Sequence, residues 1–167
     1  MRNKLFLVLT IVLTAALVAT AQTKTTGTAS CAKPAPAYSI DVGDHAGHAL
    51  SINKTACTWS KPMEIAGLQT KDGYDVVYGD TNGDKVRGTG YHVSNMSNGD
   101  KIYVRFQGND TMKDGRPSTS EGTWSYSGGT GKLKGIKGKG TYKGKADASG
   151  NMVFEVEGDY VVPAAKK

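Results

Sequence analysis

The sequence predicts an all-β protein, a closed antiparallel barrel of about eight strands. Apolar and polar side chains alternate along several short segments, the period-two pattern of a strand with one buried face. In residues 101–107, for example, Ile102, Val104 and Phe106 alternate with other side chains. Turn-forming pairs such as Asn98-Gly99 separate these segments, and none of them has a convincing helical period. Closure into a barrel would remove the free edges that an open sheet exposes.

The first 21 residues have the layout of a secretory signal peptide. Arg2 and Lys4 precede an apolar run at residues 5–18, and the small residues Ala19 and Ala21 follow it. The run is shorter than the roughly 20 residues that cross a bilayer, which argues against an uncleaved membrane anchor. We therefore predict cleavage near Ala21, a secreted or periplasmic protein, and no stable membrane insertion after cleavage.

The rest of the chain divides into three parts by composition. Residues 22–37 are rich in Thr, Ala, Lys and Pro and predict a flexible N-terminal segment. Residues 38–163 predict a single barrel domain, and residues 164–167 a basic tail. Cys31 and Cys57 form a disulfide by default after export, closing a loop of about 26 residues. Two free thiols or a metal-binding pair are the alternatives, and no Cys-x-x-Cys spacing supports a metal.

Strands are predicted where alternating, β-branched or aromatic residues lie between turn signals. Pro62 punctuates the long segment at residues 48–59, and a turn signal lies at residues 71–73. In the long segment Leu50 and Ile52 share one face, and Cys57 and Trp59 share the other. The strands predicted in this half of the domain are residues 38–42, 48–59, 63–65, 74–78 and 87–94.

The second half of the domain follows the same pattern. Turns are predicted at residues 98–100 and 147–151, and a loop at residues 109–117. Trp124 and Tyr126 share one face of their strand. The predicted strands are residues 101–107, 121–127, 141–146 and 152–162. The apolar face of the last one carries Met152, Phe154, Val156, Tyr160 and Val162.

Residues 128–140 combine dense glycine with lysine and only two large apolar side chains, Leu133 and Ile136. The Walker and Rossmann glycine spacings are absent, so a phosphate-binding loop is not indicated. Glycine allows positive φ and close backbone approach where a barrel bends or a loop folds under it. We predict that Leu133 and Ile136 close one end of the barrel from a single helical turn.

The same stretch resembles the Gly-Gly-Thr-Gly-x-φ-x-x-x-x-Gly signature, with φ apolar, of allene-oxide-cyclase-like and dirigent-like barrels. The matching residues are Gly128-Gly129-Thr130-Gly131-Lys132-Leu133 and Gly135-Ile136-Lys137-Gly138, and the resemblance spans roughly residues 121–162. The chain is also similar to small secreted bacterial proteins with the same tail. The resemblance implies a calycin-like or allene-oxide-cyclase-like barrel of eight antiparallel strands, often oligomeric, with an interior pocket. It carries over no catalytic residue of the cyclases and does not imply the phenolic chemistry of the dirigent proteins.

Polar side chains on neighbouring strands give one candidate ligand pocket, made of His92, Tyr103, Arg105, Glu121 and Glu155. If these faces point into the barrel, they bind a small polar ligand or supply a general acid and base. If they point outward, they are solvated surface, and the apolar faces of the same strands fill the core. We favour the outward arrangement, because antiparallel sheets usually keep their polar face in water.

His45 and His48, with Asp41 and Asp44 beside them, are the candidate metal ligands. Residues three apart on a strand point to opposite faces, so the two imidazoles converge only if Ala46-Gly47 forms a turn. The simpler interpretation is a solvated polar loop, and we predict no metal.

Lysines are concentrated in one region of a chain whose formal net charge is +6. Six of them lie within residues 132–145, where they either attract anionic surfaces or form a solvated face, and we favour the solvated face. We expect no cofactor and no nucleic-acid partner. The sequence predicts a non-catalytic barrel that binds a small molecule or serves as a structural or interaction module. A homo-oligomer is a candidate assembly. The alternative is an isomerase- or lyase-like enzyme that acts in the barrel interior.

Overall fold

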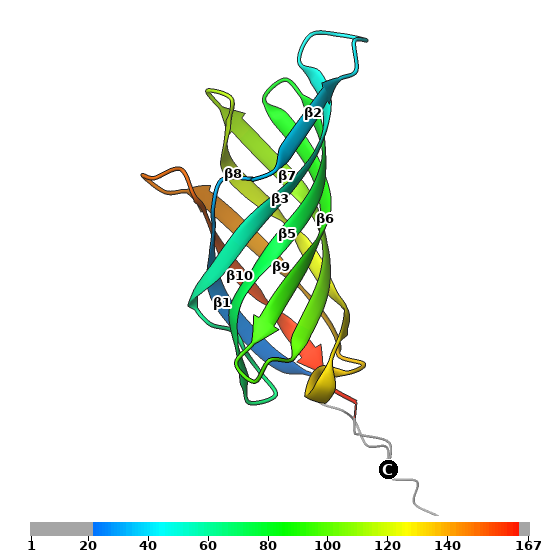
Figure 1. Cartoon of the computed structure of the whole chain (residues 1–167), viewed down its shortest axis with the longest axis vertical. Helices are drawn as coiled ribbons and strands as arrows, with labels where there is room; N and C mark the ends of the chain where they lie inside the picture. Colours follow the sequence, from blue (N-terminus) through cyan, green and yellow to red (C-terminus); the bar gives the residue numbers. More distant parts are fainter. Residues whose placement is uncertain (1–21, 164–167) are drawn as a thin grey trace, which may run out of the picture.

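The structure, a computed structural model, describes residues 22–163. The predicted signal peptide and basic tail lie outside the described residues. The chain forms a closed, eight-stranded antiparallel barrel, as predicted (Figure 1). The strands are β1 (Thr23–Cys31), β2 (Ala37–Asp41), β3 (His48–Lys61), β4 (Glu64–Ile65), β5 (Leu68–Asn82), β6 (Lys85–Met96), β7 (Lys101–Lys113), β8 (Arg116–Gly129), β9 (Lys137–Ala146) and β10 (Met152–Val161).

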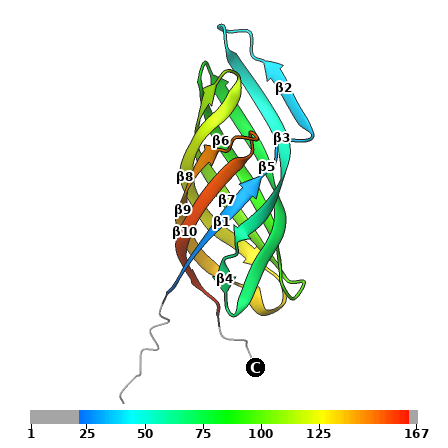
Figure 2. The same cartoon turned by 90° about the vertical axis from the view of Figure 1, so that its left-hand side faces the viewer.

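The barrel closes through its first strand, because β1 pairs with β10 on one side and with β3 on the other (Figure 2). From β3 the order runs through β5, β6, β7, β8 and β9 to β10, and every neighbouring pair is antiparallel. The short strands β2 and β4 are additions: β2 pairs with the part of β3 that extends beyond β1, and β4 pairs with the start of β5. Within residues 22–163, no helix is long and apolar enough to cross a membrane.

The prediction that residues 22–37 are a flexible segment is wrong for Thr23–Cys31, which form β1. The inward positions of this strand carry the small residues Thr25, Gly27, Ala29 and Cys31, all of which are buried. Small side chains give almost no hydropathy contrast with their polar neighbours, so the alternation was hidden in the sequence. They are small because large side chains lie against this strand: a Cβ on Gly27 would clash with the side chains of Trp59 and Met63.

Two of the predicted connections are also different in the structure. The turn expected at residues 71–73 lies inside β5, where the register with β6 shifts between Thr70 and Asp72. Such a bulge bends a strand without ending it, so a turn-like composition is compatible with continuous pairing. The loop expected at residues 109–117 is a hairpin, in which β7 runs on to Lys113 and a tight turn at Asp114-Gly115 leads into β8.

One end of the barrel is closed by the glycine-rich stretch, as predicted. Within the described residues, the one helical element is a turn of 3₁₀ helix, η1 (Gly131–Leu133), seen in gold at the lower end in Figure 1. Leu133 and Ile136 are both 0% exposed and belong to a core cluster with Ile65, Met96 and Ile102. The core of the protein therefore sits at this end of the barrel.

Candidate functional site

The interior contains a cavity of about 220 Å³ beyond the core cluster. Its walls are mainly apolar and aromatic, with Phe106, Trp124, Phe154 and Val156 among the lining residues. The exposed residues Pro34 and Pro117 also line it, so the cavity reaches the surface at the end opposite to η1. A closed base and an open mouth make this the best-formed binding site in the described part of the chain.

The five predicted pocket residues do not come together. His92 lines the cavity, whereas Arg105, Glu121 and Glu155 are exposed on the outer surface and Tyr103 lies on the same outer face of β7 as Arg105. The register explains the separation, because His92 pairs with Val104 and Tyr103 pairs with Val93 across β6 and β7. His92 and Tyr103 therefore point to opposite sides of the wall.

The outward members of the set have surface roles. Lys143 of β9 pairs with Glu121 on one side and with Glu155 on the other, which gives a ladder of alternating charge across three strands. The Arg105 guanidinium lies 5.3 Å from the centre of the Tyr91 ring. Opposite charges and cation–ring contacts of this kind stabilise a solvated sheet face modestly.

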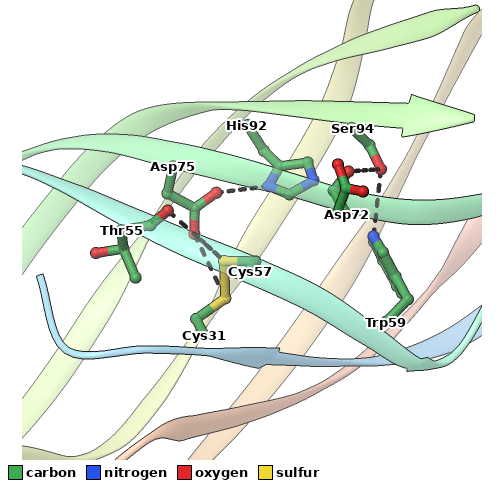
Figure 3. Close-up of a disulfide and its surroundings, with 8 residues drawn as sticks. All are labelled: Cys31, Thr55, Cys57, Trp59, Asp72, Asp75, His92 and Ser94. Atoms are coloured by element: carbon green, nitrogen blue, oxygen red, sulfur yellow. Dashed lines mark hydrogen bonds and ion pairs between the residues drawn. A yellow bond between two sulfur atoms is a disulfide. The ribbon is translucent and has the colours of Figure 1, made fainter. Parts of the chain in front are cut away.

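A histidine–carboxylate pair is the main polar feature of the cavity wall. His92 Nδ1 lies 2.6 Å from Asp75 Oδ1, and the two side chains are only 14% and 17% exposed. When Asp75 is ionised, it accepts a hydrogen bond from the Nδ1–H of a neutral His92, which leaves Nε2 as a hydrogen-bond acceptor. Nε2 is buried and has no partner among the described residues; in Figure 3 it lies on the side of Ser94 and Trp59. A bound molecule with a hydroxyl or amine group can satisfy it.

The predicted disulfide is present and lies beside this pair (Figure 3). Cys31 and Cys57 are directly opposite each other in the β1–β3 register, and the bond indicates an oxidising compartment. Asp75 Oδ2 lies 3.5 Å from the sulfur of Cys57 and 3.9 Å from that of Cys31. Disulfide sulfurs carry no hydrogen, so these contacts are packing contacts that hold the carboxylate between the bridge and His92.

A second polar group lies on the cavity wall formed by β7, β8 and β9. Burial raises the pKa of Asp110, and a hydrogen bond with Ser120 opposes this shift. Burial also raises the pKa of Tyr142 to about 12, and the nearby charge of Asp110 adds to this rise. Both side chains therefore favour their neutral forms more than they would in water, and each can then donate a hydrogen bond to a ligand.

Sequence reasoning missed Asp75, Asp110 and Tyr142 as cavity residues. Asp75 lies on the same face of β5 as Val77, and Asp110 lies on the same face of β7 as Phe106. This shared face was the only signal in the sequence that either carboxylate points inward. Asp110 fell in the loop predicted at residues 109–117, whereas Asp75 lay within the strand predicted at residues 74–78 and was not considered as a site residue.

The outer surface is divided into two unlike halves. Exposed apolar and aromatic side chains cover β2, β3, β5 and β6, with exposures from 36% for Tyr74 to 74% for Ile40. The register makes them contiguous, since Tyr38 pairs with Ile52 and Ile52 with Tyr78. We refer to this surface as the outer aromatic face; its members are Tyr38, Ile40, Ile52, Tyr74, Tyr78 and Tyr91. The outward positions of β8, β9 and β10 carry mostly Thr, Ser, Lys and Glu.

Three of the four candidate metal ligands, Asp44, His45 and His48, converge, and Asp41 is not part of this group. Gly47 has a φ of +79°, and the turn that it makes brings His45 and His48 to the same side of the loop between β2 and β3. The Nδ1 atoms of the two rings lie 3.1 and 2.6 Å from Oδ1 of Asp44. This cluster lies outside the barrel cavity, in the loop that joins β2 to β3.

Comparison with models of known protein families and with curated protein sequences finds no match. A function for this chain is therefore inferred from the cavity and from the side chains around it.

Proposed function

We propose that this protein is a secreted or periplasmic binding protein that holds a small, mainly apolar molecule inside its barrel without transforming it. The observation that carries this proposal is the cavity of about 220 Å³, with apolar walls and a few fixed polar groups. A dry apolar cavity of about 150 Å³ accommodates benzene, so this one suits a somewhat larger aromatic or short aliphatic molecule.

The polar groups of the cavity narrow the class of ligand. Asp75, Asp110 and His92 line the cavity, and among residues 22–163 no Lys or Arg side chain does so. An anionic ligand would therefore meet carboxyl groups without a compensating cation, at a high desolvation cost. The buried Nε2 of His92 needs a hydrogen-bond donor. We infer a neutral or cationic ligand that carries a hydroxyl or amine group on an apolar body.

The compartment and the family are part of the same proposal. The disulfide and the signal-peptide layout of residues 1–21 both support export. The closed eight-stranded barrel, with its glycine-rich stretch at one end, supports a relationship to the allene-oxide-cyclase-like and dirigent-like barrels.

Filling the cavity is expected to weaken the binding of a neutral apolar probe such as N-phenyl-1-naphthylamine. Gly88 lines the cavity, and a Cβ there would make only ordinary contacts, the nearest at 3.6 Å from Val77. Gly88→Phe therefore adds a ring to the cavity without a backbone clash. Probe fluorescence should give an affinity at least tenfold weaker than that of the unmodified protein, a loss of about 1.4 kcal/mol.

The matched control for this experiment is Thr89→Phe, which adds the same ring to the exposed face of the same strand. It is expected to leave probe affinity within about twofold, a change of about 0.4 kcal/mol. Equal affinities for Gly88→Phe and the unmodified protein would show that the cavity is not the binding site.

The second candidate function is an isomerase- or lyase-like activity, favoured by one observation. The Asp75–His92 pair, with its unpartnered Nε2, has the arrangement of a carboxylate-oriented general base. Native mass spectrometry of the protein from its own compartment would identify a retained molecule. Recovery of that molecule unchanged after incubation supports a binding protein, whereas its conversion, lost in His92→Phe, supports an enzyme.

We also propose that the outer aromatic face joins copies of this chain. Its exposed side chains present roughly 600 Å² by the usual area of such residues, at the upper end for a single patch on a monomer. This approaches the roughly 800 Å² that each partner contributes to a standard interface. Two cations, Lys54 over Tyr74 and Arg105 over Tyr91, flank the face.

Size-exclusion chromatography with light scattering tests this interface. The unmodified protein is expected to have a mass of at least two chains, and Ile52→Lys, at the centre of the face, to raise the dissociation constant at least tenfold. Thr123→Lys, on the polar half of the barrel, is the control and should leave the mass unchanged. A single-chain mass for the unmodified protein at every concentration would refute the proposal.

A further inference from the structure

The loop between β2 and β3 places two imidazoles and a carboxylate within ligand-sharing distance at the tip of the molecule. This loop is the uppermost part of Figure 1, far from η1. One donor atom from each of Asp44, His45 and His48 lies within 4.8 Å of the others. The two histidine rings have centroids 4.8 Å apart and are tilted by 30°.

The local backbone explains why these side chains meet. Gly43 and Gly47 adopt positive φ values of +80° and +79°, which glycine reaches without strain. The His48 carbonyl accepts a hydrogen bond from the Val42 N–H at 3.0 Å, closing the loop. The Gly47 carbonyl accepts another at 3.0 Å from Gly83, in the neighbouring β5–β6 hairpin. The loop is therefore anchored to a second element rather than hanging free.

We propose that Asp44, His45 and His48 form a binding site for a divalent first-row transition-metal ion such as Zn²⁺. Imidazole nitrogen and carboxylate oxygen are the ligands that Zn²⁺ takes at about 2.0–2.1 Å, which places neighbouring ligands of a tetrahedral ion about 3.3 Å apart. The present Nδ1–Oδ1 separations are 3.1 Å for His45 and 2.6 Å for His48. The His45 separation is already close to this value, and the His48 separation would have to widen by about 0.7 Å to admit the ion.

A fourth residue supplies the outer support that metal-binding histidines usually have. His48 Nε2 lies 3.3 Å from Oδ1 of Asp80 on β5, while Nδ1 faces Asp44. If Nδ1 binds the metal, Nε2–H donates a hydrogen bond to Oδ1 of Asp80, which fixes the orientation of the ring and raises its basicity.

The donor set also decides which ions are excluded. Ca²⁺ and Mg²⁺ take six or more oxygen ligands, and two of the three groups here are imidazoles. Zn²⁺, Cu²⁺ and Ni²⁺ accept imidazole readily and differ in affinity in the usual order for such ions. Three protein ligands leave one position of a tetrahedral ion open to water or to an exogenous ligand.

Titration of the full mature chain with ZnCl₂ by calorimetry tests the site. One equivalent is expected to bind, with no heat from Ca²⁺ or Mg²⁺, and amide NMR shifts should concentrate in residues 43–48. His45→Ala and His48→Ala should abolish this binding. Asp80→Asn should weaken it by about tenfold or more, as loss of an outer-shell carboxylate does.

The matched control is Asp84→Asn, because Asp84 is an exposed carboxylate in the turn next to the cluster. It should leave zinc affinity unchanged. The proposal is overturned if no binding occurs, if the histidine variants still bind, or if the NMR shifts fall elsewhere. Because these residues are at the loop tip, circular dichroism of the variants should match that of the unmodified protein, which separates loss of a ligand from loss of fold.

Discussion

Ile136→Ala is expected to lower the free energy of unfolding by about 2–5 kcal/mol, the usual cost of truncating a buried aliphatic side chain. Ile136 and Leu133 are both 0% exposed and close the barrel at the η1 end. The rigid strands around them cannot collapse into the space left by the missing atoms, so the cavity term adds to the lost transfer free energy. Urea unfolding followed by tryptophan fluorescence measures the change.

Lys137→Ala, next to Ile136 and exposed, is the control for this substitution and should stay within about 0.5 kcal/mol of the unmodified protein. Leu133→Ala should lower the free energy of unfolding about as much as Ile136→Ala does. Because the two residues share one cluster, the effect of the double variant should differ from the sum of the two single effects. An effect of Ile136→Ala as small as that of Lys137→Ala would mean that the end of the barrel is held closed by other residues.

Removal of the disulfide is expected to cost about 2–5 kcal/mol. The bond joins residues 26 apart in sequence, and the chain-entropy model gives about 3 kcal/mol for a loop of this size. It also fixes the end of β1 to β3 at a point where both cysteines are buried. The double variant Cys31→Ala, Cys57→Ala keeps small side chains in these inward positions, so the loss reports mainly on the crosslink.

Urea unfolding of this double variant should agree with unfolding of the unmodified protein in a strong reductant. The reductant should not change the unfolding of the double variant, which has no disulfide. This control excludes effects of the reductant other than reduction of the bond. Equal midpoints for the oxidised and reduced unmodified protein would contradict a stabilising role. Loss of the bridge should also loosen Asp75, which contacts both sulfurs, and weaken probe binding in the cavity.

Much of the architecture was predictable, because alternation is a strong signal wherever large apolar residues make it. Ile102, Val104 and Phe106 on β7, and the apolar face of β10, point inward as expected. The Cys31–Cys57 bond and the closure of one barrel end by Leu133 and Ile136 were also predicted correctly, although only Leu133 lies in the helical turn. The signal failed at β1, whose buried positions are small, and at β5, whose bulge has the composition of a turn.

The candidate site was less predictable, because it depends on register between strands. Asp75 and His92 are direct partners across β5 and β6, which no property of either segment alone reveals. His92 was grouped with Arg105, Glu121 and Glu155 because all four are polar. Successive residues of a strand point to opposite faces, so a difference of one position decides whether a side chain lies inside or outside the barrel. The convergence of the candidate metal ligands depended on a single turn. The sequence shows the two glycines of this turn, Gly43 and Gly47, but it does not show that they adopt positive φ.

The pairing of β1 with β10 has a consequence for the order of events in folding. Thr23 lies opposite Tyr160, so the last contact needed for closure joins the two ends of the described chain. Contacts so distant in sequence form slowly, because a long loop must first be closed. Until then β3 and β10 both expose unpaired edges, which are the usual starting points of aggregation. During folding, the edges of β3 and β10 must therefore be kept from pairing with other chains. This requirement ends when β1 pairs with both strands.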